Sequence, residues 1–127
     1  MLELSTRYAI KALMHLAELD TEQFTDVKSL SQKTRLPGPY LSKLMKVLAT
    51  KGIVEAKRGR LGGVRLPSSN APSSFLDICA ALEDPIVNQQ CFLAKNAGDS
   101  EKQCLMHRHW MEMKEQIISF LKERKIS

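Results

Sequence analysis

The sequence lacks the features that would assign it to a membrane or an exported protein. Its 127 residues contain no run approaching the roughly 20 apolar residues that span a bilayer, so we expect no membrane segment. The first helix-like run, Ser5 to Leu19, is interrupted by charged side chains and lacks the apolar core of a signal peptide. Without such signals, the expected location is the cytoplasm.

Cysteine is also scarce. The three cysteines, Cys79, Cys91 and Cys104, are an odd number at wide spacing, which is a poor disulfide framework and favours reduced thiols or metal ligands. The sequence has no Cys-x-x-Cys pair, no paired carboxylates at useful spacing and no phosphate-cradling loop before a helix. These absences argue against a small metalloenzyme or redox enzyme, and we predict that the protein is not an enzyme.

Acidic residues are nearly missing from one part of the chain. Between Lys28 and Arg65 there is a single acid, Glu55, so this stretch carries a charge of +9 although the whole chain carries only +5. Charge concentrated in this way indicates a polyanionic partner. The ten basic residues of the stretch are Lys28, Lys33, Arg35, Lys43, Lys46, Lys51, Lys57, Arg58, Arg60 and Arg65.

Two helices are predicted before and at the start of this basic stretch. Apolar residues recur at helical spacing from about Thr6 to Leu19, with Ser5 as the expected N-cap. After a polar turn, Thr25 is the expected N-cap of a short second helix, which the turn beginning at Arg35 ends.

A third helix follows that turn. Pro39 suits its first position, and Gly52 suits its C-terminal end. Its buried stripe, at i, i+3, i+4 and i+7, comprises Leu41, Leu44, Met45 and Leu48. Two short strand-like pieces, 53–56 and 64–66, then flank a glycine-rich basic turn. Helix, turn, helix and basic hairpin in this order predict a winged helix-turn-helix.

This arrangement favours double-stranded DNA as the partner. A recognition helix enters the major groove, while arginines at a wing tip suit a narrow minor groove. RNA is disfavoured because Tyr40 is the only aromatic residue of the stretch. An ordinary solvated basic helix face is the alternative. The predicted DNA-binding residues are Lys28, Pro39, Tyr40, Ser42, Lys43, Lys46, Arg58 and Arg60.

Beyond Pro67 a polar linker leads to a further helix. Ser74 and Asp77 resemble a capping box, and Cys79 falls on the expected buried face, so we interpret it as a core residue rather than a ligand. Asp84 and Pro85 are expected to end this helix, and a loop without periodicity follows to about residue 99.

The last segment, from about Glu101 to Lys125, predicts a long helix. Its apolar stripe suits packing between helices of a homodimer; packing within its own chain and recruitment of another protein are the alternatives. The stripe comprises Met106, Trp110, Met113, Ile117 and Phe120. We therefore divide the chain into a winged helix-turn-helix domain (1–67), a linker helix with a sensor loop (68–100) and a dimerisation helix (101–127). The predicted fold class is mainly α with a small β-hairpin wing.

Several short motifs resemble the Rrf2 family of bacterial winged-helix regulators, and the resemblance runs nearly end to end. They are Leu4 to Ala9, Pro39 to Leu41, Arg58-Gly59 with Gly62-Gly63, Phe75 to Ile78 with Ala81 to Glu83, and Cys104 to His107 with Trp110. The resemblance implies a DNA-binding homodimer, often a repressor, whose long C-terminal helix makes the dimer. A twofold dimer would in turn demand a palindromic operator. Family members include an iron-sulfur cluster regulator, a nitric-oxide sensor and a cysteine-metabolism repressor.

The resemblance also implies iron-sulfur ligands at Cys91, Cys104 and His107. The middle cysteine of the family pattern, expected around 97–99, is absent, so a two-iron two-sulfur cluster would lack one ligand. Asp99, Glu101 or a residue of the partner subunit is a candidate to complete the set. The alternatives are a cofactor-free regulator controlled by a protein partner or small ligand, and a thiol switch between the two cysteines.

Overall fold

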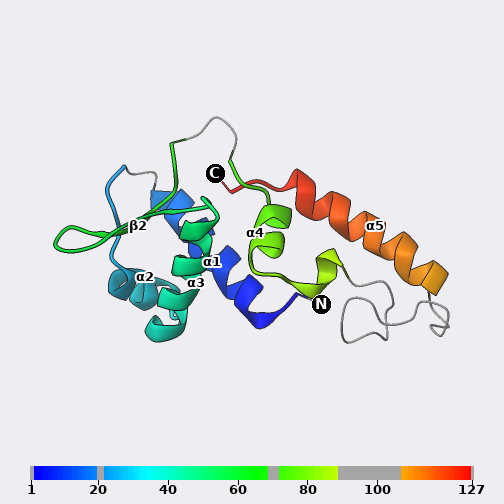
Figure 1. Ribbon diagram of the computed structural model, residues 1–127, viewed down its shortest axis with the longest axis horizontal. Coiled ribbons are helices and arrows are strands. Elements are labelled where there is room, and N and C mark those ends of the chain that lie inside the picture. Colours follow the sequence, from blue (N-terminus) through cyan, green and yellow to red (C-terminus); the bar gives the residue numbers. More distant parts are fainter. Residues whose placement is uncertain (1, 20–21, 69–71, 89–106, 127) are drawn as a thin grey trace.

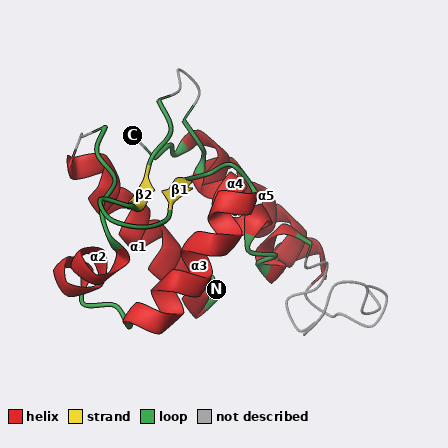
Figure 2. Cartoon of the chain, turned by 60° about the vertical axis from the view of Figure 1, so that its left-hand side comes forward, coloured by secondary structure: helices red, strands yellow, loops and turns green. Residues whose placement is uncertain are grey.

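The computed structural model describes residues 2–19, 22–68, 72–88 and 107–126, and confirms the predicted fold class. Three helices and a two-stranded hairpin gather at one end, and a long C-terminal helix runs along the other (Figures 1 and 2). The elements are α1 (Leu4–Leu19), α2 (Val27–Thr34), α3 (Gly38–Thr50), β1 (Glu55–Lys57), β2 (Gly63–Arg65), α4 (Phe75–Ala81), the 3-10 helix η1 (Pro85–Val87) and α5 (His107–Glu123).

The main core lies between α1, α2, α3 and α4. Leu13 of α1, Leu30 of α2 and Leu41 of α3 have no exposed surface, because the apolar stripe of each helix turns inward. The four residues predicted as the buried stripe of α3, Leu41, Leu44, Met45 and Leu48, are all at most 6% exposed. This shared core sets the angle at which α3 presents its opposite face.

Two predicted helix caps are wrong. Ser5 lies inside α1, which begins at Leu4, and the carboxylate of Asp84 accepts hydrogen bonds near this helix end instead. Asp26 rather than Thr25 is the N-cap of α2, because Thr25 is held in a bridge to Val64. The Asp26 side chain accepts from the Ser29 backbone, and hydrogen bonding by Ser29 lowers the pKa of this carboxyl.

The hairpin is shifted from its predicted bounds. Ile53 and Val54 are buried before the strand begins, and the antiparallel register pairs Glu55 with Arg65 and Lys57 with Gly63. Thr25 adds a third extended segment through two hydrogen bonds of 2.8 Å, one in each direction between its backbone and that of Val64. The wing is therefore attached to the segment between α1 and α2, which no local sequence pattern indicated.

The capping box predicted at the start of α4 is confirmed. The Ser74 hydroxyl accepts from the Asp77 backbone at 3.0 Å, and the Asp77 carboxylate accepts from the Ser74 backbone at 2.8 Å. Cys79 is fully buried, as predicted for a core residue. The helix ends at Ala81, slightly before the predicted Asp84, and η1 occupies the first residues of the expected loop.

Helix α5 packs against α4 and is shorter in the described residues than the predicted helix. It contains 17 residues beginning at His107, and the predicted residues 101–106 lie outside the described part. Backbone bonds of 2.8 Å, from Phe75 to Arg124 and from Ile126 to Ser73, fasten the chain after α5 to the start of α4. None of the helices in the described residues has the length and apolar content to cross a membrane.

Candidate nucleic-acid interface

Helices α2 and α3 are joined by a tight turn that fixes their relative direction. Arg35 adopts a left-handed conformation with φ of 59°, and the Leu36 backbone donates to the Ser31 carbonyl at 3.2 Å. Helix α3 begins at Gly38, so Pro39 occupies its second position rather than the predicted first. The turn leaves the face of α3 opposite its buried stripe accessible.

That exposed face carries three of the predicted contact residues. Pro39, Lys43 and Lys46 are exposed, and Thr50 lies further along the same face. Ser42 is half-buried at its edge. Amine, hydroxyl and methyl groups on one helix face are the types that meet phosphates and base edges in a major groove.

Two residues of α3 differ from the sequence-based expectation. Tyr40 is half-buried because its ring packs edge-on against Tyr8 of α1, with centroids 5.7 Å apart, so one side of it is committed to the fold. Val47, which we did not predict as a contact residue, is 39% exposed beside Lys43 and Lys46. Its position four residues after Lys43 places it on the same helix face, but its apolar side chain sets it apart from the basic residues by which that face was predicted.

The wing tip exposes Arg58 and Arg60 as predicted from the glycine-rich turn. Leu61, which lies between Arg60 and β2, is 83% exposed and has a left-handed φ of 64°. Gly62 packs so closely that a Cβ there would come within 2.3 Å of the Lys57 carbonyl oxygen. The turn is thus compact, and its basic side chains extend outward.

Nine of the ten basic residues between Lys28 and Arg65 are exposed, including Lys28 on α2. The exception is Arg65 at the base of the wing. Its Nε donates to the Glu55 carboxylate at 2.8 Å, and its guanidinium lies 4.3 Å from the centre of the Phe24 ring. The free positive charge is therefore concentrated on α2, α3 and the wing tip.

The predicted dimer stripe of α5 divides into two sets. Trp110 is only 5% exposed and packs within its own chain against Cys79, Ile86 and Leu121. Ile117 is half-buried beside this cluster. Met113 and Phe120 are 56% and 51% exposed, and Met106 lies outside the described residues.

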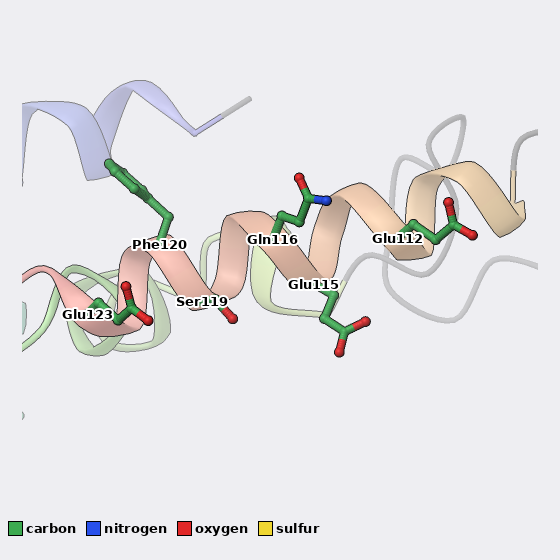
Figure 3. Close-up of a pocket in the computed structure, with 6 residues that line it drawn as sticks. All are labelled: Glu112, Glu115, Gln116, Ser119, Phe120 and Glu123. Atoms are coloured by element: carbon green, nitrogen blue, oxygen red, sulfur yellow. The ribbon is translucent and has the colours of Figure 1, made fainter.

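An open groove on α5 includes Phe120, a member of the exposed set. It is lined by Glu112, Glu115, Gln116, Ser119, Phe120 and Glu123. Figure 3 shows Phe120 projecting from the helix on the side away from Glu115. Three carboxylates line this groove, in contrast to the basic surface at the other end of the molecule.

Lys114 is an unexpected buried residue of α5. Only 8% of it is exposed, and burial lowers the pKa of its amine. It falls at a helical position between Trp110 and Leu121, where sequence periodicity favours an apolar side chain. The sequence offered no sign that a lysine would be buried here.

The predicted metal ligands cannot be assembled from the described residues. Cys91 and Cys104 lie outside them, and His107 is placed only as the first residue of α5. Within the part of the chain that the structure describes, no group of three His, Cys, Asp or Glu residues is arranged to hold a metal. Cys79 is unsuited to ligation, because burial and the nearby Asp84 charge raise the pKa of its thiol to about 11.

Comparison with known proteins agrees with this geometry. The Rrf2 family model, described as an iron-dependent transcriptional regulator, matches residues 2–127. A protein of Aquifex aeolicus (strain VF5), named for the helix-turn-helix type of transcriptional regulator, is 30% identical over 120 residues, which are 93% of this chain and 83% of the relative. The regulator NsrR of Geobacillus kaustophilus is 32% identical over 89 residues, or 70% of this chain and 60% of NsrR.

Solved structures show the same fold at lower identity. CymR of B. subtilis, whose structure is described as that of the global cysteine regulator, aligns with a TM-score of 0.76 and 22% identity over 99% of this chain and 92% of CymR. IscR of T. potens aligns with a TM-score of 0.73 and 22% identity over 99% of this chain and 82% of IscR.

Proposed function

The chain belongs to the Rrf2 family of helix-turn-helix transcriptional regulators, and we propose that it represses transcription by binding a palindromic operator as a homodimer. The observation that carries this proposal is the exposed basic face of α3 next to a wing with exposed arginines at its tip. The exposed cations would neutralise phosphates and release counterions, which provides affinity without sequence preference. Sequence preference requires contacts to base edges.

We assign the base contacts to α3 and the wing tip. Ser42, Lys43 and Lys46 would meet base edges in the major groove, where lysine pairs with guanine acceptors. Arg58 and Arg60 would enter the neighbouring minor groove, and Lys28 of α2 would meet a phosphate. Pro39 and Tyr40 would border the contact at the start of α3, because Tyr40 is partly occupied by Tyr8.

Operator binding is tested with duplexes selected from a random library. Lys43→Ala and Arg58→Ala should each weaken binding to the selected duplex by about 1–3 kcal/mol, and the affinity of the unmodified protein should fall linearly with salt on logarithmic axes. Lys122→Ala on α5 is the matched control, because Lys122 is equally basic and exposed but lies on the dimer helix. Undiminished affinity in both interface variants would refute these assignments.

We also propose that α5 forms the dimer through its exposed apolar edge rather than through its acidic groove. A twofold contact brings the same surface of two copies together. A dimer formed through the groove would therefore place Glu112, Glu115 and Glu123 of one copy against the same carboxylates of the other. Met113 lies outside this groove, and Phe120 lines it but projects on the side away from Glu115, so a contact centred on these two apolar side chains would keep the carboxylates apart. In an antiparallel pair centred between Gln116 and Ile117, Met113 of one copy lies opposite Phe120 of the other.

This seam is tested by Phe120→Asp in sedimentation velocity. A buried carboxylate at the seam should convert the dimer to a monomer of 14.3 kDa without unfolding it, because Phe120 is 51% exposed within its own chain. Leu61→Asp is the control, since Leu61 is exposed on the distant wing tip. A monomer in the unmodified protein would favour a module that recruits another protein.

Signal sensing is assigned to Cys91, Cys104 and His107. Thiolate and imidazole suit an iron-sulfur cluster, but three donors are one short of the four that a two-iron cluster takes, and Asp99, Glu101 or the partner subunit would have to complete them. Anaerobic purification, with iron and sulfide analysis and absorbance spectra, tests for the cluster. Colourless protein that binds the operator supports the cofactor-free alternative, and operator binding that changes with oxidation supports the thiol switch.

A further inference from the structure

We propose that Arg65 is a positioning residue, which holds the wing in its DNA-binding orientation and does not itself contact phosphate. This inference rests on the proposed function, because it assumes that the wing tip meets DNA. Arg65 is the only one of the ten basic residues between Lys28 and Arg65 that is not exposed.

The guanidinium of Arg65 has three different partners. Its Nε donates to Glu55 Oε2 at 2.8 Å, its Nη1 donates to the Glu22 carbonyl at 2.6 Å, and its centre lies 4.3 Å from the Phe24 ring centroid. A planar group with several fixed donors can make these contacts together, whereas a lysine ammonium cannot. The neighbouring Lys57 also lies near the Phe24 ring, at 5.9 Å, but it is exposed.

These partners come from separate parts of the chain. Glu55 is opposite Arg65 across the hairpin, while Glu22 and Phe24 belong to the segment between α1 and α2. Arg65 therefore joins both strands to the helical body. The two backbone hydrogen bonds between Thr25 and Val64 lie beside it and also hold the hairpin to this segment.

The contacts lie at the base of the hairpin, and the arginines proposed to meet DNA lie at its tip. Arg60 lies five positions before Arg65, in the turn that precedes β2. A tilt at the base would therefore displace the tip, and a shift on the order of 1 Å is enough to weaken contacts to a groove. The ion pair with Glu55 also cancels the charge that Arg65 would offer to a phosphate.

The inference is tested by a double-mutant cycle in which operator affinity is measured. Arg65→Gln should weaken binding about tenfold in the otherwise unmodified protein and less than about twofold when Arg58 and Arg60 are both alanine, because Arg65 acts through the tip. Arg65→Lys should not restore binding. In the background that lacks both tip arginines, Arg65→Gln should leave the salt dependence of affinity unchanged, since Arg65 itself contacts no phosphate.

Glu55→Gln distinguishes a positioning role of Arg65 from a phosphate contact by Arg65, because the two roles predict opposite changes in operator affinity. Removing this carboxylate should weaken binding if Arg65 needs it as an anchor, and strengthen binding if Arg65 contacts phosphate. The Glu55 side chain is 44% exposed, so this variant should fold and test the proposal even if Arg65→Gln fails to fold.

Two results would overturn the inference in distinguishable ways. Additive losses, with a salt slope lowered by about one, would make Arg65 a phosphate contact and leave the proposed function intact. Full affinity after loss of both tip arginines would overturn the wing assignment itself, and the positioning role with it.

Discussion

The Thr6 hydroxyl donates a 2.7 Å hydrogen bond to the carboxylate of Asp84, although the two residues are 78 positions apart. Both are essentially without exposed surface. The same carboxylate accepts from the Glu3 backbone at 2.9 Å and from the Ile86 backbone at 2.9 Å. One side chain thus joins the start of α1 to the turn that follows α4.

Asp84→Ala should lower the free energy of unfolding by roughly 2–4 kcal/mol, because it leaves a buried hydroxyl and two backbone donors without their acceptor. Urea unfolding measures the loss. The penalty should shrink when Thr6 is valine, since one of the stranded donors is then absent. Glu83→Gln, a neighbouring exposed position, is the control, and an equal loss there would contradict the cause.

Gly63→Ala should disrupt the attachment of the wing. A Cβ at Gly63 would lie 2.1 Å from the Thr25 carbonyl oxygen, and the φ of +136° is unfavourable for alanine. We expect a loss of roughly 1–3 kcal/mol and faster amide exchange at Thr25 and Val64.

Gly38→Ala is the matched control for this substitution. The nearest atom to its Cβ, Ser31 Oγ, is at an ordinary 3.6 Å, and the position is helical, so stability should stay constant or rise by about 0.5–1 kcal/mol. Equal responses of the two variants would show that the close approach of Gly63 to Thr25 does not matter.

Local patterns predicted the helices well because their causes are local. The stripe from Leu41 to Leu48 follows from helical spacing alone, and the pairing of Ser74 with Asp77 lies within one turn. A predicted helix cap is wrong where a residue distant in the sequence binds the backbone of the predicted capping residue. Thr25 is extended because it pairs with Val64, and this pairing passes the cap of α2 to Asp26.

The positive charge of the candidate site could be predicted from the sequence. Which basic residues are exposed and which are paired could not. Composition located the basic stretch, but nothing in it distinguished Arg65, which is paired with Glu55, from Arg58, which is exposed. Periodicity placed Trp110 and Met113 on one stripe of α5. It did not determine which of them packs on α4, because that depends on the position of a helix far away in the sequence.

Cys79 should resist alkylation in the native protein. Its thiol is fully buried, and a pKa of about 11 leaves almost no reactive thiolate at pH 8. In a variant with Cys91 and Cys104 replaced by serine, iodoacetamide should label Cys79 only as urea unfolds the chain. Rapid labelling of the folded variant would show that the α4–α5 core opens readily.

Lys114→Met should stabilise the protein at neutral pH, because burial disfavours the charged amine. A lysine whose pKa is lowered by folding binds its proton less well in the native state, so the full penalty applies below the native pKa. The penalty disappears as the pH rises towards the unfolded value of about 10.4, and the advantage of methionine should disappear with it. Urea unfolding between pH 7 and 10 measures this trend, with Lys122→Met at an exposed position of α5 as control. Destabilisation by Lys114→Met at pH 7 would mean that the ammonium has a stabilising anionic neighbour, for which Glu112 and Glu115, which line a surface depression of α5 together with Lys114, are the first candidates.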